Sequence, residues 1–414
     1  MNKHMPYDLA QMQSLPLKAK ITMTKQRIRQ WYEYWDGLVY VSFSGGKDST
    51  VLKHIVDSMY DDVPALFVNT GLEYPEIQSF VRDIKNGKFD CFNSDVEIVR
   101  PEMRFDEVIK KYGYPAVSKE VSDTISGAKN SIEKGVYSHR LCKLGVQRNE
   151  YGGLEDDGKY DYERTLHKSM YSQKQWRFLL DADFDVSSYC CDVMKKRPAK
   201  NYEKKTGRKA IIGTMAWESQ NRRTAWIRHG CNSFEGKRQT SQPLSFWTEQ
   251  DILHYIKKYN VPYCPVYGDI VTHDADGNTY DMPNDYLDAL SESVPEFETT
   301  GCSRTGCVFC TFGCHREPSP NRFQRLKETH PRQYEYCING GEYITEGFCQ
   351  NGSGDWVQFV FEDDDGNPLT PEEIENFIEE CKDNPHFRFE RKWQPSKEGL
   401  GLGKVLDYIG VDYK

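Results

Sequence analysis

The 414-residue sequence predicts a doubly wound α/β fold, in which helices cover both faces of a mostly parallel sheet, followed by a cysteine-rich metal-binding region toward the C-terminus. Short runs of β-branched and aromatic residues alternate with segments of helical periodicity over the first hundred residues, as in parallel sheets whose strands are joined by helices. The first of these runs leads into a glycine-rich loop at residues 44–49. Four cysteines between residues 302 and 314 predict the metal-binding region.

Hydrophobic periodicity gives the elements in order. The expected strands cover residues 38–43, 65–69, 96–99 and 209–213. The expected helices cover residues 17–36, about 48–60 and about 75–85, and capping boxes at 248–251 and 370–373 mark the start of two later helices. A short hairpin around 356–361 is expected to turn at the acidic stretch 362–366.

Composition narrows the class of protein. Hydrophobic residues make up 38% and charged residues 28%, and the formal net charge of −9 disfavours a wholly basic nucleic-acid binder. A local run of eight lysines and arginines lies between Lys195 and Lys209. Residues 1–20 contain two prolines and no continuous apolar stretch. We therefore expect a cytoplasmic protein without a signal peptide or a membrane partner.

The loop Ser44-Gly-Gly-Lys-Asp-Ser49 has the chemistry of a phosphate-binding loop. Two glycines let the backbone turn tightly, so that successive N–H groups and the N-terminus of the next helix point at an anion. Two serine hydroxyls and Lys47 supply further donors. The loop fits neither G-x-x-x-x-G-K-S/T nor G-x-G-x-x-G. The alternative interpretation is a glycine turn with an Asp cap on the helix.

Residues 40–50, Tyr-Val-Ser-Phe-Ser-Gly-Gly-Lys-Asp-Ser-Thr, resemble the PP-loop of the adenine nucleotide α-hydrolase-like proteins, and within them the phosphoadenosine phosphosulfate (PAPS) reductase family. Segments that resemble later motifs of this family follow in order at residues 67–76, 189–198, 212–222 and 243–267. The chain departs from the family at Asn69, where Asp is usual, and lacks its C-terminal E-C-G-L-H motif. The long chain is more similar to PAPS reductase-like proteins common in phages and mobile elements.

The resemblance implies a nucleotide site and a division of the chain. Arg222 would pair with a phosphate, and Glu218 would orient Arg222 or form a surface salt bridge with it. The implied domains are an N-terminal helical segment (1–36), a nucleotide-binding α/β domain (37–267, with a helical insert at about 120–189), an insert with the cysteine-rich region (268–340) and a small α+β region (341–414). The implied nucleotide-binding residues are Ser42, Ser44, Gly45, Gly46, Lys47, Asp48, Ser49, Asn69, Thr70, Gly71, Gly213, Glu218, Ser219 and Arg222.

The compact set Cys302-x4-Cys307-x2-Cys310-x3-Cys314 could supply four thiolates to a 4Fe–4S cluster or to zinc. The resemblance to the family favours iron and suggests another ligand set, in which Cys190 and Cys191 join Cys307 and Cys310. With the compact set, Cys190 or Cys191 becomes a candidate sulfur-carrying nucleophile, whose pKa Lys195 would help to lower. A buried structural pair is the other interpretation of Cys190 and Cys191.

Three functions follow. The first is a PAPS reductase-like enzyme that binds PAPS, adenylyl sulfate or ATP, with Mg2+ as a further cofactor candidate, and reduces or transfers sulfur with an iron–sulfur cluster. The second is an ATP-dependent, adenylating enzyme that modifies nucleic acid with sulfur, similar to the sulfur-mobilising component of DNA phosphorothioation. The third is a nucleotide sensor with structural zinc. Candidate partners are the nucleotide substrate, a sulfur donor or thiol reductant protein, DNA or tRNA, and a second copy of the chain.

Overall fold

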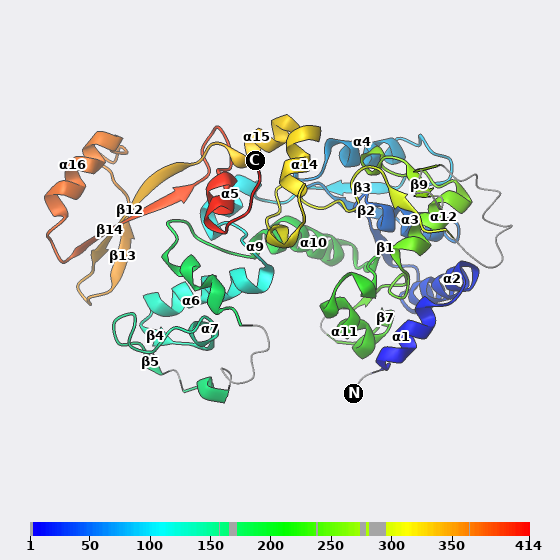
Figure 1. Ribbon diagram of the computed structural model, residues 1–414, viewed down its shortest axis with the longest axis horizontal. Coiled ribbons are helices and arrows are strands. Elements are labelled where there is room, and N and C mark those ends of the chain that lie inside the picture. Colours follow the sequence, from blue (N-terminus) through cyan, green and yellow to red (C-terminus); the bar gives the residue numbers. More distant parts are fainter. Residues whose placement is uncertain are drawn as a thin grey trace. The chain divides into compact units, whose positions relative to one another are not determined.

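The structure is a computed structural model that describes residues 3–156, 158–164, 172–236, 239–273, 279–280, 295–363 and 365–414. The chain forms two compact units, Met1–Arg104 with Asp192–Val308 and Phe105–Cys191 with Phe309–Lys414. Figure 1 shows the elements of both. Among the described residues, no helix is long and apolar enough to cross a bilayer. The predicted four-part division of the chain stays a prediction.

The first unit is built on a six-stranded sheet with the order β3-β2-β1-β6-β8-β7. Its strands are β1 (Val39–Ser42), β2 (Ala65–Val68), β3 (Val96–Val99), β6 (Lys209–Ile212), β7 (Asn232–Ser233) and β8 (Thr240–Ser241). Neighbouring strands run parallel except for β7, which pairs antiparallel with β8. The mostly parallel sheet predicted from the sequence is confirmed, and the four expected strands agree with the structure to within one residue at each end.

Seven helices of the first unit are α1 (Pro6–Gln13), α2 (Leu17–Tyr34), α3 (Lys47–Asp57), α4 (Pro75–Lys85), α10 (Arg197–Thr206), α11 (Gln220–His229) and α12 (Glu249–Tyr259). The predicted capping box of α12 forms, since the Thr248 hydroxyl oxygen accepts the Asp251 N–H and Asp251 accepts the Thr248 N–H. A second sheet of this unit has the order β10 (Thr279–Tyr280), β9 (Ile270–His273), β11 (Glu298–Thr299). Short helical turns lie at Asp192–Lys196 (a π-helical turn), Ala216–Glu218 and Pro265–Tyr267.

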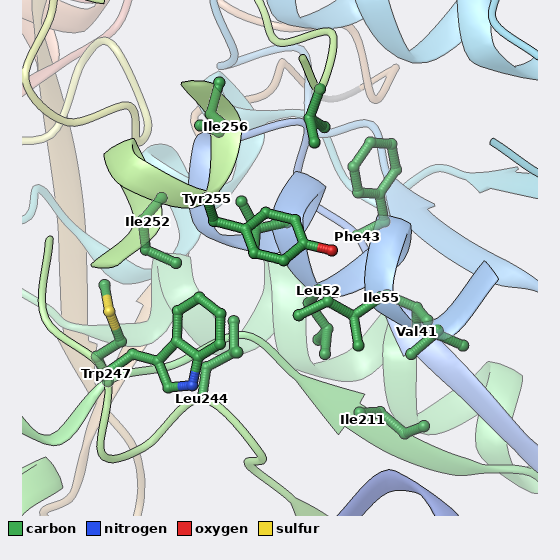
Figure 2. Packing of buried hydrophobic residues seen from close by; sticks show 14 of the residues in the cluster. Val41, Phe43, Leu52, Ile55, Ile211, Leu244, Trp247, Ile252, Tyr255 and Ile256 are labelled. Atoms are coloured by element: carbon green, nitrogen blue, oxygen red, sulfur yellow. The ribbon is translucent and has the colours of Figure 1, made fainter. Parts of the chain in front are cut away.

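Helices pack on both faces of this sheet. On one face, Val41 and Ile211 share a buried core with Leu52 and Ile55 of α3 and Ile252 of α12 (Figure 2). On the other face, Tyr40, Leu66 and Ala210 form a smaller core with Tyr202 of α10. Successive strand residues point to opposite faces, so strands covered on both sides are apolar throughout. The doubly wound arrangement is confirmed.

The strand order changes direction between β1 and β6. The chain runs from β1 through α3 to β2 on one side of β1, whereas β6, its other neighbour, comes more than 160 residues later. In such sheets, ligands bind in the crevice outside the carboxyl ends of the two strands at this point. The loop at residues 44–49 follows β1, and therefore lies at this position.

The second unit contains a three-stranded antiparallel sheet of β13 (Trp356–Phe359), β12 (Glu342–Gln350) and β14 (Phe387–Gln394). Its longer helices include α5 (Phe105–Tyr112), α6 (Lys119–Glu133), α14 (Arg322–Thr329), α15 (Pro331–Ile338), α16 (Pro371–Cys381) and α17 (Leu402–Tyr408). The predicted hairpin is confirmed only in part, because the chain reverses at the acidic stretch but β13 itself pairs with the preceding β12, to which residues 351–355 connect it. The acidic stretch closes only an isolated bridge between Glu362 and Pro368.

Candidate functional site

The loop between β1 and α3 requires glycine at residue 45. Gly45 has φ +71°, and a Cβ there would lie 2.8 Å from Ile77 Cγ2 and 3.0 Å from Val81 Cγ2 on α4. A side chain would therefore be disfavoured both by its backbone conformation and by the packing of α4. At Gly46, the N-cap of α3, a Cβ would lie 3.1 Å from both the Tyr267 hydroxyl and Thr305 Oγ1. The loop is thus enclosed on both sides.

Serine hydroxyls hold the loop in this shape. Ser49 Oγ donates to the Gly46 carbonyl at 2.9 Å and accepts the Ser44 N–H at 3.1 Å. The Ser44 and Ser49 hydroxyls are 3.0 Å apart, and Ser44 Oγ also accepts the Gly46 N–H at 3.3 Å. The two serines predicted as donors to a ligand therefore also build the loop itself.

The loop forms one wall of a cavity of about 270 Å³ at the carboxyl ends of β1 and β6. Five further residues, Ile212, Thr214, Tyr267, Arg304 and Thr305, complete its lining together with nine predicted residues. Of the other five predicted residues, Gly45 and Ser219 adjoin lining residues in sequence, whereas Asn69, Thr70 and Gly71 do not. The nine predicted residues in the lining are Ser42, Ser44, Gly46, Lys47, Asp48, Ser49, Gly213, Glu218 and Arg222. Ser219 instead caps α11, since its hydroxyl accepts the Arg222 N–H at 3.3 Å.

Lys47 is buried in the wall of the cavity, with 4% of its surface exposed. Its ammonium group pairs with Glu249 Oε1 at 2.8 Å and donates to the Ser303 carbonyl. The ammonium also lies 5.1 Å from the centre of the Tyr267 ring, and the Lys47 backbone N–H donates to the Tyr267 hydroxyl at 3.1 Å. Burial raises the pKa of Tyr267, which keeps this hydroxyl protonated at neutral pH.

Glu218 holds two guanidinium groups at the cavity. Its carboxylate pairs with Arg222 through Oε2 and with Arg304 through Oε1, and Oε2 also accepts the Met215 N–H at 2.9 Å. The side chain of Glu218 is only 7% exposed, which distinguishes this cluster from a solvated surface pair. Burial and the positive charge of Arg304 lower the pKa of Arg222 from its ordinary value.

Two buried polar atoms in the cavity wall have no hydrogen-bond partner among the described residues: Asp48 Oδ1 and Thr214 Oγ1. Buried polar atoms are normally paired, so each of these two atoms is available to pair with a bound ligand. Burial raises the pKa of Asp48, whereas the nearby Lys47 lowers it. The Thr214 hydroxyl can donate a hydrogen bond to a phosphate oxygen. The Asp48 carboxylate can bind a cation that accompanies the phosphate group.

A second cavity, of about 160 Å³, shares Ser42, Ser44 and Thr305 with the first. Its other lining residues are mostly apolar, and its charged residues are Glu73 and Lys195. The predicted nucleotide-binding segment 69–71 lines neither cavity. Instead, Thr70 Oγ1 donates to Glu73 Oε1 at 2.6 Å, and Asn69 Oδ1 accepts the Gly71 N–H at 3.1 Å. This segment therefore holds Glu73 at the second cavity.

The candidate metal ligands are divided between the units: Cys302 and Cys307 belong to the first, Cys310 and Cys314 to the second. Within the described ranges of the chain, no three His, Cys, Asp or Glu side chains form a group suited to a metal ion. All thirteen cysteines lie in these ranges and are thiols rather than disulfides. Burial raises the pKa of Cys314 to about 12, and its thiol donates to the Thr311 carbonyl at 2.9 Å. The four-cysteine ligand set stays a prediction.

Cys190 and Cys191 lie partly exposed in α9 (Tyr189–Cys191) of the second unit. The π-helical turn Asp192–Lys196 follows them, and Lys195 within this turn lines the second cavity. Turns of this kind occur frequently at functional sites. The catalytic roles predicted for Cys190, Cys191 and Lys195 stay predictions.

Sequence analysis missed five lining residues, Ile212, Thr214, Tyr267, Arg304 and Thr305, and also Glu249, the partner of Lys47. Tyr267 ends a segment that resembles the family, which was a usable signal. Arg304 and Thr305 lie between two of the predicted metal ligands, Cys302 and Cys307, in a segment that the sequence analysis did not connect with the nucleotide site. Contacts that join residues more than 200 positions apart, such as Lys47 with Tyr267, leave no local pattern.

Comparisons with known proteins identify the family of the chain. The profile of the phosphoadenosine phosphosulfate reductase domain matches residues 38–134 and 138–313. Sulfate adenylyltransferase subunit 2 of Bacteroides thetaiotaomicron is 30% identical over 105 residues, which are 22% of this chain and 33% of that protein. An uncharacterised protein of Methanocaldococcus jannaschii is 28% identical over 153 residues, 36% of this chain and 29% of that protein. The chain thus spans about a third of the length of the curated relatives it matches.

The crystal structure of PAPS reductase from Candida auris in complex with phosphate aligns with 58% of this chain and 82% of that one, at 14% identity and a TM-score of 0.32. The profile match covers more than half of the sequence and includes the loop, β1, β6 and the cavity residues up to Thr305. The chain therefore belongs to the family of the phosphoadenosine phosphosulfate reductase domain.

Proposed function

We propose that this chain is an enzyme that binds the phosphate or sulfate groups of an adenine nucleotide in the cavity beside residues 44–49 and promotes reaction at that end of the nucleotide. The observation that carries the proposal is the buried Thr214 hydroxyl without a partner, in a cavity that also contains the loop and two guanidinium groups. Donors already fixed in place stabilise charge that develops on phosphate or sulfate oxygens during reaction.

The candidate ligands are PAPS, adenylyl sulfate and ATP. Each carries an anionic group that Arg222, the loop amides and the Thr214 hydroxyl can bind. Asp48 would hold a Mg2+ ion that arrives with ATP, and such an ion would neutralise and orient the phosphate oxygens. The relatives named sulfate adenylyltransferase subunit 2 support ATP, whereas the family match supports PAPS.

In the finer form of this proposal, the enzyme reduces or transfers sulfur. Cys190 or Cys191, with Lys195, would accept sulfur, and the set Cys302, Cys307, Cys310 and Cys314 would hold a 4Fe–4S cluster or zinc. Anaerobic purification followed by iron, acid-labile sulfide and zinc analysis tests the cluster. About four iron and four sulfide per chain support the redox form, and one zinc without iron refutes it.

Equilibrium titration of the purified chain with ATP plus Mg2+ and, separately, with PAPS tests the nucleotide site. We expect binding of at least one ligand, and a loss of about tenfold or more in Lys47→Ala, because a buried charge-assisted contact is removed. Lys88→Ala removes a lysine that pairs with Asp83 on the surface and serves as the matched control. Failure of the wild-type chain to bind either nucleotide would refute the proposal.

A second candidate function is ATP-dependent modification of nucleic acid. The observation in its favour is a row of exposed lysines, Lys196, Lys200 and Lys204, four residues apart along α10 and the turn before it. Binding to DNA or tRNA that weakens steeply between 50 and 200 mM salt would support this function. The rate of ATP turnover to AMP and pyrophosphate should rise when DNA or tRNA is added, and an unchanged rate would count against this function. Nucleotide binding without any turnover would indicate a sensor.

A further inference from the structure

The segment between Cys302 and Cys307 is anchored at both ends in the first unit. On its N-terminal side, the Gly301 N–H donates to the Tyr267 carbonyl at 2.8 Å and the Cys302 N–H to the Val266 carbonyl at 3.0 Å. On its C-terminal side, the Val308 N–H donates to the Leu72 carbonyl at 2.8 Å. These bonds hold the residues between the two cysteines beside the phosphate loop.

Three successive residues of this segment contact residues that line the first cavity. The Ser303 carbonyl accepts a hydrogen bond from the Lys47 ammonium. Arg304 pairs with Glu218, and the Thr305 hydroxyl lies 2.7 Å from the Tyr267 hydroxyl. Arg304 lines the first cavity and Thr305 lines both. The segment is therefore a wall of the site.

The hydrogen bonds at Tyr267 indicate how Thr305 is oriented. The Tyr267 hydroxyl accepts the Lys47 N–H, and its own buried proton also needs an acceptor. Thr305 Oγ1, at 2.7 Å, can accept this proton. When Thr305 accepts this proton, its own proton is available to an acceptor in the cavity. This orientation makes Thr305 a donor toward an anion.

Arg304 is placed to exchange partners. Arg222 and Arg304 both pair with the single carboxylate of Glu218, so the three side chains together carry a net positive charge. The side chain of Arg304 is 61% exposed, so its movement from Glu218 to a ligand oxygen requires little change in hydration. A guanidinium binds phosphate or sulfate with two parallel hydrogen bonds, which an ammonium group cannot do.

We propose that Arg304 and Thr305 bind the anionic group of the nucleotide directly, and that the segment Cys302–Cys307 becomes more ordered when the nucleotide binds. This inference rests on the proposed function and assigns two further residues to the same site. It also makes the cysteine-bounded segment part of the nucleotide site, whatever the two thiols themselves bind.

Titration with ATP plus Mg2+ and with PAPS tests the two side chains. For the nucleotide that the wild-type chain binds, we expect Arg304→Ala to weaken binding by about tenfold or more, and Thr305→Val by about two- to tenfold. Arg304→Lys should lie between Arg304→Ala and the wild type. Arg223→Ala removes an exposed arginine of α11 that lines neither cavity, and should bind within twofold of the wild type.

Hydrogen–deuterium exchange of the wild-type chain, with and without saturating nucleotide, tests the ordering without any substitution. We expect slower exchange in a peptide covering residues 302–308 and no change in one covering residues 86–95. Unchanged exchange at 302–308, or unchanged affinity in both Arg304→Ala and Thr305→Val, would overturn the inference while leaving the proposed function standing. Absence of nucleotide binding by the wild-type chain would instead refute the proposed function itself.

Discussion

Replacement of Gly45 by alanine tests whether the phosphate loop depends on its close contact with α4. The backbone of Gly45 is left-handed, and an alanine in that conformation costs about 1–2 kcal/mol. The added methyl group would also lie 2.8 Å from Ile77 Cγ2 and 3.0 Å from Val81 Cγ2, side chains packed in the core. Overpacking of this kind costs about 1–3 kcal/mol. The free energy of unfolding should therefore fall by about 2–5 kcal/mol.

Gly87→Ala is the matched control. Gly87 has φ +72°, almost the same as Gly45, but no atom outside its chain neighbours lies within 4 Å of its added Cβ. Its cost should be the backbone contribution alone, about 1–2 kcal/mol. The difference between the two variants then isolates the contact between the loop and α4.

The assay is hydrogen exchange of peptides from β1 and α3 at increasing urea concentration, because the chain has two units and a global signal would mix their unfolding. We expect Gly45→Ala to destabilise these peptides more than Gly87→Ala does, and to weaken nucleotide binding as the loop shifts away from α4. Equal destabilisation by the two substitutions would refute the reasoning.

Three other predictions concern charged groups of the first unit. Glu249→Gln removes the carboxylate that competes for Lys47 and should strengthen nucleotide binding about two- to fivefold in calorimetry at low salt; weaker binding would contradict this. Lys20→Met leaves the buried Asp251 without the ammonium 2.7 Å away and should cost about 3–5 kcal/mol in the urea assay, part of which a second change of Asp251 to Asn should restore. Burial raises the pKa of Asp57 to about 6, so its contribution to stability is complete below about pH 4 and is lost as the pH rises through 6. The stability of the wild type relative to Asp57→Asn should thus fall by about 3 kcal/mol over this range, and a constant difference would contradict the shift.

The central sheet could be predicted from the sequence because its signals are local. Val39 to Val41 are apolar without alternation, as expected for a strand covered on both faces, and the glycines after them mark the turn into α3. The capping box at Thr248 identified the start of α12 in the same way. Each of these signals lies within a few residues of the element that it predicts.

The remaining features depend on contacts between distant segments. The start of α3 and the position of Arg222 were foreseeable, whereas the role of Arg304 depends on Glu218, 86 positions earlier in the chain. The hairpin of the second unit was misplaced because the stretches before and after β13 both carry turn residues. Cross-strand pairing selects between them, and in the structure Phe359 pairs with Gly347 of β12.

The charges at the first cavity are nearly balanced before any ligand arrives. Lys47 is matched by Glu249, and Arg222 and Arg304 share Glu218. A free phosphate or sulfate ion that bound these cations would compete with carboxylates that already pair with them, and it brings no other group to compensate for that competition. A nucleotide carries a sugar and a base, which can supply this compensation in the adjoining apolar cavity. Under the proposed function, the internal carboxylates would therefore favour whole nucleotides over small inorganic anions.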